Sequence, residues 1–271
     1  MRQTLTSLLA IFCFTWSYAQ QPGEEAGSSS TLVIPPAQKE AFQIYLLMGQ
    51  SNMVGRDTHN IASQGTSPHV LALDEAGQWT VARDPLHHSE GRIPPGVGPG
   101  MSFAFEILKT KPNVTIGLVP CAVGGTPLRR WVKGGDLYEK AVNRAKIAAQ
   151  SGVIAGVLWH QGETDATKEG NANSYEARLT QMFKDLRTDF GKPALPIVVG
   201  QLGGFLRPDK EPYAETVRTA IQQMPSVLLS VGYADSANLP DKGDKLHFSA
   251  EAQKEFGVRY AKSMLDLQKG N

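Results

Sequence analysis

The sequence reads Ile44-Tyr45-Leu46-Leu47-Met48-Gly49-Gln50-Ser51-Asn52-Met53, an apolar run followed at once by a glycine and a short polar segment. The apolar run predicts a buried strand, and the polar segment lies where that strand would end and a helix begin. A buried strand delivers a side chain rigidly to the carboxyl edge of a sheet, where the next turn can direct backbone N–H groups at an oxygen. Ser51 is therefore a candidate nucleophile, although a serine at such a junction can also simply cap the helix.

Short apolar runs alternate with longer helical patterns along the rest of the chain. We predict strands over residues 42–48, 114–119, 153–159, 197–202 and 227–233, and helices over 101–109, 137–150, 174–190, 213–223 and 250–267. The strands are apolar on both faces, and the alternation implies parallel strands joined by right-handed crossovers. The sequence therefore predicts a three-layer α/β/α sandwich with about five parallel strands.

Residues 58–100 interrupt this alternation, because they are rich in glycine, proline and histidine and show little periodicity. So long an irregular segment in a compact domain indicates either a functional loop or an element that the pattern does not reveal. The adjacent pair His87-His88 lacks a matching set of carboxylate or cysteine ligands, so we expect a surface loop there. We expect no metal and no cofactor.

The first residues have the features of a secretory signal peptide: a positive charge, an apolar run and, in Ser17-Tyr18-Ala19, the small residues Ser17 and Ala19 of a cleavage site. The apolar run is too short to anchor the protein in a bilayer. We expect a signal peptide over 1–19, a flexible lead-in rich in Gly, Ser, Pro and Glu over 20–39, and one domain over 40–271. The protein is thus predicted to be secreted or periplasmic.

Composition excludes some partners. The formal net charge of +1 and the pI near 7.8 give no support to nucleic acid or an anionic membrane surface as a partner. Once the signal peptide is removed, Cys121 is the only cysteine, so the protein must fold without an internal disulfide. Its stability must come from a large core, in which we expect Cys121 to be a small buried residue.

Three more polar clusters follow predicted strands. Gly124-Gly125-Thr126 follows the second strand, His160-Gln161-Gly162-Glu163 follows the third, and Asp244-Lys245-Leu246-His247 follows the fifth. In a parallel sheet such strand ends gather at one edge. The glycines would let the backbone present N–H groups to a ligand, while a nearby carboxylate and imidazole are what a weakly nucleophilic serine needs.

Two carboxylates compete for the role of the acid beside His247. Asp244 is favoured, because three residues of separation in one turn let its carboxylate reach the imidazole while the other ring nitrogen stays free. Glu163 is the rival. If Asp244 is the acid, we expect Glu163 to hold the amide of Gln50 or Gln161 in place.

Four motifs in this order resemble the pattern of the SGNH (GDSL-like) hydrolases: Gly-Gln-Ser-Asn-Met at 49–53, Gly-Gly-Thr at 124–126 followed by Trp131, Gln-Gly-Glu at 161–163, and Asp-x-x-His at 244–247. More narrowly, they resemble the sialate O-acetylesterase and acetylxylan esterase branch, carbohydrate esterase family six. The resemblance extends from about residue 42 to 247 and implies the flavodoxin-like fold of these hydrolases.

The resemblance implies that Ser51 is the nucleophile, His247 the base and Asp244 the orienting acid. The oxyanion donors that it implies are the N–H of Ser51, a backbone N–H at Gly124 or Gly125, and the side chain of Gln161. Gln161 departs from the asparagine of the wider superfamily, but it agrees with the narrower branch.

The remaining polar and aromatic side chains of the motifs leave alternatives open. Gln50 is a candidate substrate contact. Arg129 and Trp131 are either a solvated helix start or a wall that contacts sugar rings, and the sequence does not decide between the two. His160, beside Trp159, is more typical of a packing and hydrogen-bonding residue than of a second base.

The resemblance implies a two-step acyl transfer through an acetyl-serine intermediate. The implied substrate is an acetylated carbohydrate, with acetylated xylan as the first candidate and O-acetylated sialic acid as the alternative. A non-catalytic glycan-binding module is the alternative of another class, and the joint presence of Ser51, Asp244, His247 and Gln161 argues against it. The sequence does not indicate an oligomeric state.

Overall fold

The computed structural model describes residues 32–88 and 93–269. The predicted signal peptide and most of the predicted lead-in lie outside these residues. Within them the chain forms seven strands and seven α-helices. None of the described helices is both long and apolar enough to cross a membrane.

The strands are β1 (Phe42–Gly49), β2 (Val70–Leu73), β3 (Trp79–Val81), β4 (Thr115–Pro120), β5 (Val153–His160), β6 (Ile197–Gly200) and β7 (Val231–Ala234). The helices are α1 (Ser51–Val54), α2 (Gly100–Thr110), α3 (Asp136–Ala148), α4 (Glu169–Asn173), α5 (Tyr175–Asp189), α6 (Ala214–Val227) and α7 (Ala250–Lys269).

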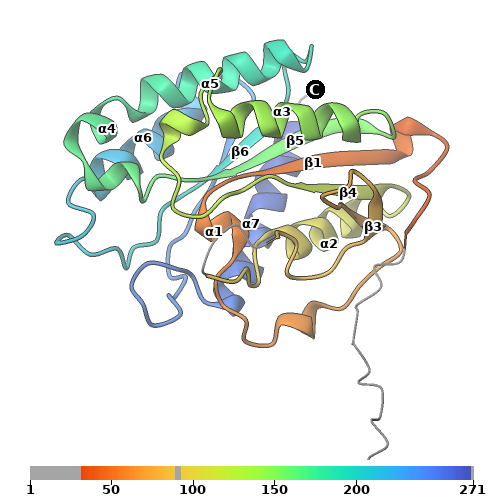
Figure 1. Cartoon of the computed structure of the whole chain (residues 1–271), viewed down its shortest axis with the longest axis horizontal. Coiled ribbons are helices and arrows are strands. Elements are labelled where there is room, and N and C mark those ends of the chain that lie inside the picture. The colour runs from red at the N-terminus through yellow and green to blue at the C-terminus, as the bar shows by residue number, and fades with distance from the viewer. Residues whose placement is uncertain (1–31, 89–92, 270–271) are drawn as a thin grey trace, which may run out of the picture.

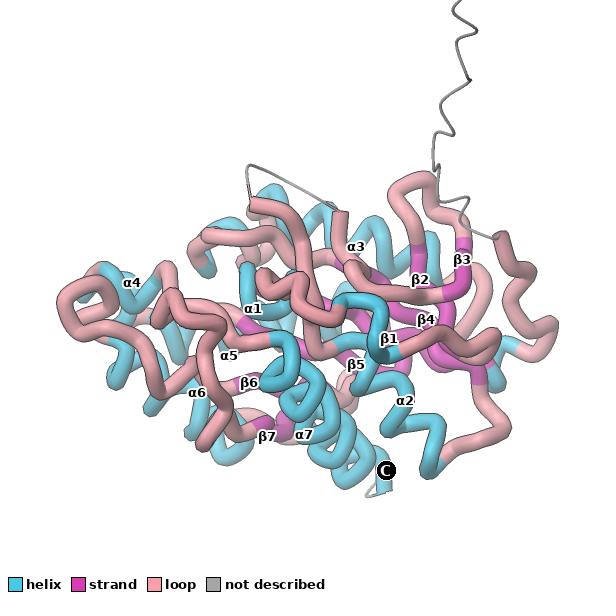
Figure 2. Tube along the Cα trace, turned by 90° about the horizontal axis from the view of Figure 1, so that it is seen from below, coloured by secondary structure: helices cyan, strands magenta, loops and turns pink. Residues whose placement is uncertain are grey.

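A single sheet runs through the centre, in the order β3-β2-β4-β1-β5-β6-β7. All neighbouring strands are parallel except the pair β2 and β3, which is antiparallel. Helices α3, α5 and α6 cover one face, and α2 and α7 pack together on the other (Figures 1 and 2). The predicted three-layer α/β/α sandwich is confirmed.

The expected number of strands was too low, because the irregular segment 58–100 contains β2 and β3. These strands have only four and three residues, too few for a readable period. Pairing with β4 holds β2 in the sheet, and pairing with β2 holds β3. The end of the predicted lead-in also pairs with this edge, since the N–H of Val33 donates to the carbonyl of Trp79 at 2.9 Å.

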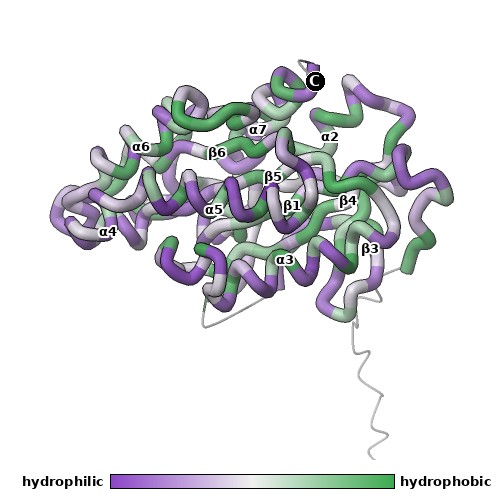
Figure 3. The backbone as a smooth tube through the Cα atoms, turned by 90° about the horizontal axis from the view of Figure 1, so that it is seen from above, coloured by the Kyte–Doolittle hydropathy of each residue, from purple (hydrophilic) through white to green (hydrophobic). Residues whose placement is uncertain are grey.

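Strand β1 shows why both faces of the sheet are apolar. Its side chains alternate between two buried clusters, with Ile44, Leu46 and Met48 on the side of α3 and α5, and Tyr45 and Leu47 on the side of α2 and α7. Figure 3 shows the central strands as hydrophobic segments between helices of mixed hydropathy. Because both faces of the strand are buried, its side chains cannot alternate between apolar and polar. The sequence therefore shows a continuous apolar run.

The topology brings three strand ends together around β1. The chain places β4 on one side of β1 and then crosses to β5 on the other, so the strand order reverses at β1. Open α/β sheets bind ligands at such a reversal, outside the carboxyl ends of the strands. Ser51 follows β1, Gly124 follows β4 and Glu163 follows β5, so all three lie at this edge.

The segment 58–100 also buries a carboxylate. Asp84 accepts hydrogen bonds from the Gln64 amide at 2.7 Å and from the N–H of Gly98, yet burial raises the pKa of Asp84 from 3.8 to about 7. The unfolded chain therefore ionises at lower pH than the folded one, and stability is lost as the pH rises from about 4 to about 7. We expect Asp84→Asn to raise the melting temperature more at pH 8 than at pH 4. Thermal unfolding at both pH values checks this, and an equal shift at both would contradict it.

Candidate active site

Ser51, His247 and Asp244 form one hydrogen-bonded chain. Ser51 is the first residue of α1, directly beyond the end of β1, and its Oγ lies 3.0 Å from His247 Nε2. The other ring nitrogen, Nδ1, lies 2.8 Å from Asp244 Oδ2. A serine, a base and a carboxylate in this order can generate an alkoxide nucleophile for acyl transfer. The structure thus brings the three predicted catalytic residues together.

Asp244 is well suited to stabilise a positive imidazole. Partial burial opposes its ionisation, but hydrogen bonds from the His247 ring and from the N–H groups of His247 and Leu246 lower the pKa of Asp244 well below its usual range. Lys242 lies 3.2 Å from the same carboxylate. The side chain of Asp244 is 35% exposed and that of His247 only 9%, so the carboxylate works from the solvent edge of the site.

Glu163, the rival carboxylate, makes other contacts. Its Oε1 accepts a hydrogen bond from Asn52 Nδ2 at 2.5 Å and lies 3.4 Å from His160 Nε2. Burial raises the pKa of Glu163, but these contacts outweigh burial and hold the pKa below its usual range. The structure therefore places Asp244, and not Glu163, beside His247.

The expected role of Gln161 as an oxyanion donor does not fit the geometry. Gln161 is fully buried, and the two hydrogens of its Nε2 are shared among three acceptors, Asp165 Oδ2 at 2.7 Å, the carbonyl of Thr126 at 3.0 Å and Gln50 Oε1 at 3.2 Å. No hydrogen of this amide is left for a ligand. Of the two amides that Glu163 was expected to hold, that of Gln161 is held by Asp165 instead.

Backbone N–H groups remain as candidate oxyanion donors. Ser51 provides the first N–H of α1, which has no acceptor within the helix. Gly124 and Gly125 lie in a loop, and among the described residues no backbone carbonyl accepts a hydrogen bond from their N–H groups. A Cβ at Gly124 would lie 3.6 Å from Ser51 Cβ and would overlap the Arg56 guanidinium, so a larger residue there would displace this side chain from its position beside the serine. This closeness brings the N–H groups of the glycine turn to the serine.

A cavity of about 470 Å³ opens over these groups, within the usual size range of small-molecule sites. It is lined by Gln50, Ser51, Arg56, Ile93, Gly124, Gly125, Glu163, Thr164, Thr167, Glu211, Leu246 and His247. The predicted contact Gln50 is among them. The sequence reasoning did not identify Arg56, Thr164, Thr167 and Glu211 as part of the site.

Arg56 is the cation in this wall. Its Nη1 donates to the carbonyls of Gly55 at 3.2 Å and Pro94 at 3.5 Å, and its Nε is buried without a partner. Among the described residues no carboxylate forms an ion pair with it, and burial lowers its pKa. A half-buried charge without a counter-ion loses part of its hydration, which is typical of a group that meets a ligand. Its position five residues after Ser51 is the signal that could have identified it.

Two predicted substrate contacts lie elsewhere. Trp131 is fully buried, where its Nε1 donates to Thr126 Oγ1 at 3.0 Å and its ring meets Trp159 edge to face at 5.5 Å. Trp131 is thus a core residue and no wall for sugars. Arg129 is exposed and does not line the cavity, as expected for a solvated helix start.

The other singled-out residues are structural in this geometry. His160 packs edge to face against Phe248 and Phe256. His87 is buried and not on the surface as expected, and burial lowers its pKa to about 3, whereas His88 is exposed. No group of three or more metal-ligating side chains occurs in the part of the chain that the structure describes. Cys121 is buried as predicted, and burial raises its pKa to about 11.

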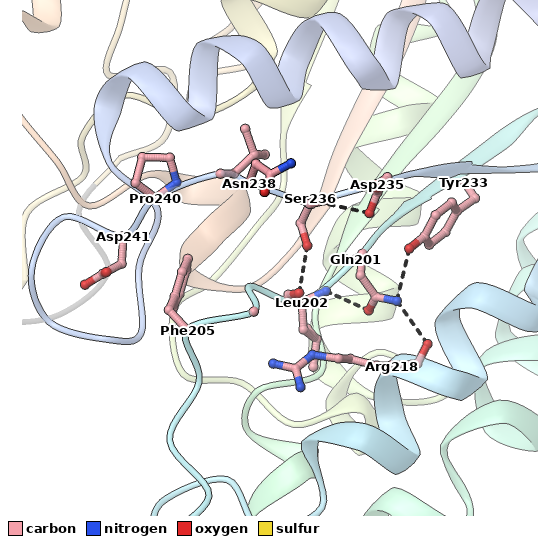
Figure 4. Close-up of a pocket in the computed structure, with 13 residues that line it drawn as sticks. Gln201, Leu202, Phe205, Arg218, Tyr233, Asp235, Ser236, Asn238, Pro240 and Asp241 are labelled. Carbon is pink, nitrogen blue, oxygen red and sulfur yellow. Dashed lines mark hydrogen bonds between the residues drawn. The ribbon is translucent and has the colours of Figure 1, made fainter.

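A second cavity, of about 540 Å³, lies at the carboxyl ends of β6 and β7 (Figure 4). None of the three residues of the Ser51 chain lines it. In its wall the buried Gln201 donates to the carbonyl of Arg218 at 3.1 Å and to the hydroxyl of Tyr233 at 3.2 Å, and accepts from the N–H of Leu202 at 2.9 Å. Gln201 thus connects β6, β7 and α6 away from the serine.

Comparison with known proteins gives a consistent picture. Residues 41–266 match the family described as "Carbohydrate esterase, sialic acid-specific acetylesterase". A probable carbohydrate esterase of Arabidopsis thaliana is 37% identical over 267 residues, which cover 90% of this chain and 96% of that protein.

Solved structures are similar as well. The crystal structure of an Arabidopsis thaliana protein has a TM-score of 0.75 at 35% identity, covering 83% of this chain and 98% of that one. A carbohydrate acetylesterase from Xanthomonas citri has a TM-score of 0.64 at 21% identity, covering 84% of this chain and 56% of that one, and shows the shared fold.

Two variants distinguish the roles of the carboxylates. Asp244→Asn keeps the turn but removes the charge beside His247 Nδ1, and the loss in kcat should reach up to about four powers of ten, as in comparable triads. Glu163→Gln should cost far less, because an amide oxygen can still accept from Asn52. Steady-state kinetics on a chromogenic acetyl ester measure both. The reversed order would move the acid role to Glu163.

Proposed function

The chain belongs to the carbohydrate esterases described as sialic acid-specific acetylesterases, and from this premise we propose that it is a secreted serine esterase that releases acetate from acetylated polysaccharide. The observation that carries the proposal is the hydrogen-bonded chain from Ser51 Oγ through the His247 ring to Asp244. The signal-peptide pattern of residues 1–19 supports secretion.

The proposed reaction has two acyl-transfer steps. His247 Nε2 accepts the Ser51 proton as Oγ attacks the acetyl carbonyl, and Asp244 stabilises the imidazolium. The N–H groups of Ser51 and of Gly124 or Gly125 bind the oxyanion, and the sugar alkoxide leaves with the proton from His247. Water, deprotonated by the same imidazole, then attacks the acetyl-serine, and acetate is released as Ser51 Oγ leaves with the proton returned by His247.

Acetylated xylan is the first candidate substrate, because a formal net charge of +1 provides no long-range attraction for a strongly anionic polymer. O-Acetylated sialic acid is the second candidate, and Arg56 is the observation that favours it. Its guanidinium faces the cavity without a carboxylate partner among the described residues, and a substrate carboxylate would fit such a group. The acids of the same wall are engaged, Glu163 with Asn52 and Glu211 with the N–H of Arg207.

Ser51→Ala tests the nucleophile and separates an esterase from a non-catalytic glycan-binding module. The variant should fold, because only a hydroxyl is removed, and should lose acetate release by several powers of ten while the oxyanion donors remain. Acetate release from acetylated xylan and from a chromogenic acetyl ester measures the effect, with circular dichroism as the control for folding. A near wild-type rate would exclude Ser51 as the nucleophile, and an inactive wild-type protein that binds glycan would support the binding module.

The substrate class can be tested through Arg56. We expect the wild-type protein to have a higher kcat/KM on acetylated xylo-oligosaccharides than on O-acetylated sialic acid. The ratio of these two kcat/KM values should change less than tenfold in Arg56→Gln. Arg129→Gln, which removes an exposed arginine outside the cavity, is the matched control. A wild-type preference for the sialic acid, lost in Arg56→Gln but kept in Arg129→Gln, would instead establish the second candidate.

A further inference from the structure

Asn52, next to the serine in the sequence, contacts the chain on both sides of His247. Its Nδ2 donates to the carbonyl of Leu246 at 3.1 Å, and its Oδ1 accepts from the N–H of Phe248 at 3.1 Å. One side-chain amide thus binds the residue before and the residue after the imidazole, as a neighbouring strand would.

The same amide is fixed from behind. The second hydrogen of Nδ2 goes to Glu163 Oε1, at 2.5 Å, and Glu163 is itself buried beside His160. Gln253, on α7, donates to the backbone carbonyl of Asn52 at 2.7 Å. Both hydrogens and the oxygen of the Asn52 amide are therefore used, and the side chain has one orientation that satisfies all of them.

The loop that carries His247 needs such an anchor. Residues 242–245 are exposed, and Gly243 and Lys245 have left-handed backbone conformations with φ of 107° and 59°. On its outer side the loop is held by Asp241, which accepts from the N–H groups of those two residues at 2.8 Å each. From the protein interior the loop is held by the packing of the buried Phe248 ring and by the hydrogen bonds of Asn52, which comes from the helix that begins with Ser51.

We propose that Asn52 is a positioning residue, whose amide fixes the backbone around His247 and so holds the imidazole at the hydroxyl of Ser51. The proposal rests on the proposed function of Ser51 and His247. It adds that Glu163, which does not touch His247, acts on the reaction through Asn52. The chemistry requires an amide, because an aspartate has the same shape but supplies neither of the two hydrogens.

The first variant is Asn52→Asp, which keeps the acceptor for the N–H of Phe248 but places a second carboxylate against Glu163 and the Leu246 carbonyl. We expect kcat on a chromogenic acetyl ester to fall about 100-fold with KM within threefold, since a displacement of about 1 Å can cost that much. In the double variant Asn52→Asp/Glu163→Gln the glutamine can donate to the aspartate. The kcat of the double variant should therefore be at least tenfold higher than that of Asn52→Asp.

Asn52→Ser removes the three contacts without adding a charge, and decides the question if Asn52→Asp does not fold. The matched control is Gln201→Glu, the same change from amide to carboxylate in a buried side chain that binds backbone groups in the wall of the second cavity (Figure 4). Gln201→Glu should lower the melting temperature but leave kcat within threefold of wild type. Circular dichroism and thermal unfolding are measured for every variant.

A serine-directed phosphonate separates this proposal from the proposed function. Its rate of reaction with Ser51 depends on the contact with His247 and not on the identity of the natural ester, and it should fall in Asn52→Ser but not in Gln201→Glu. If the wild-type protein is not labelled, or Ser51→Ala is labelled equally, the proposed function fails. If wild type is labelled and folded Asn52→Ser keeps its labelling rate and kcat within threefold, the positioning role is wrong. Absence of recovery in the double variant would overturn the role given to Glu163.

Discussion

The close approach of the last residues of β1 and β5 determines the geometry of the site. Gly49 pairs with His160 in the parallel register, and a Cβ at Gly49 would overlap the His160 backbone. The pairing continues one residue further, where the N–H of Gln50 donates to the carbonyl of His160 at 2.8 Å. Because Ser51 follows one strand and Glu163 the other, any residue larger than glycine at position 49 would separate the serine from the polar groups behind it.

Those polar groups form a buried layer in which carboxylates are paired with amides. An unpaired carboxylate in the interior is costly, and losing one partner leaves the other unsatisfied. Asp165 is compensated by Gln161 at 2.7 Å and Arg178 at 3.1 Å, and Glu163 by Asn52 at 2.5 Å. Asn52 and Glu163 join the segments that follow β1 and β5. Gln161 and Asp165 both lie in the segment after β5, and they contact the segment after β4 at the carbonyl of Thr126 and the N–H of Leu128. The layer therefore fixes the loops beyond β1, β4 and β5 relative to one another, and Ser51 lies next to it at the same sheet edge.

The sequence was sufficient for the parallel sheet, the family and the residues that meet at its edge, because long apolar strands and the strand-end rule depend on local pattern alone. The sequence was insufficient where tertiary contacts decide whether a segment forms a strand or which way a side chain points. Strands β2 and β3 are held by pairing and not by their own period. Trp131 and Gln161 have the right types for a site, but the sequence does not show that they point into the core, where Gln161 meets Asp165 four residues away. Arg56 was missed because an arginine outside the motif is typical of a surface residue, and the sequence does not show that it lines the cavity.

His247, the proposed base, is held from two different environments. Asp244 binds the ring from the solvent edge, where water supports its charge and its contact with Lys242 is weakened by salt. Asn52 binds the backbone on either side of the histidine from the interior, where no water competes for its hydrogen bonds. The contact with Asp244 determines which ring nitrogen faces the serine. The contacts with Asn52 determine the position of the backbone from which the ring extends. The role proposed for His247, which is to accept a proton from Ser51 and return it to the leaving group, needs both contacts, because the tautomer alone does not bring Nε2 to within 3.0 Å of Oγ.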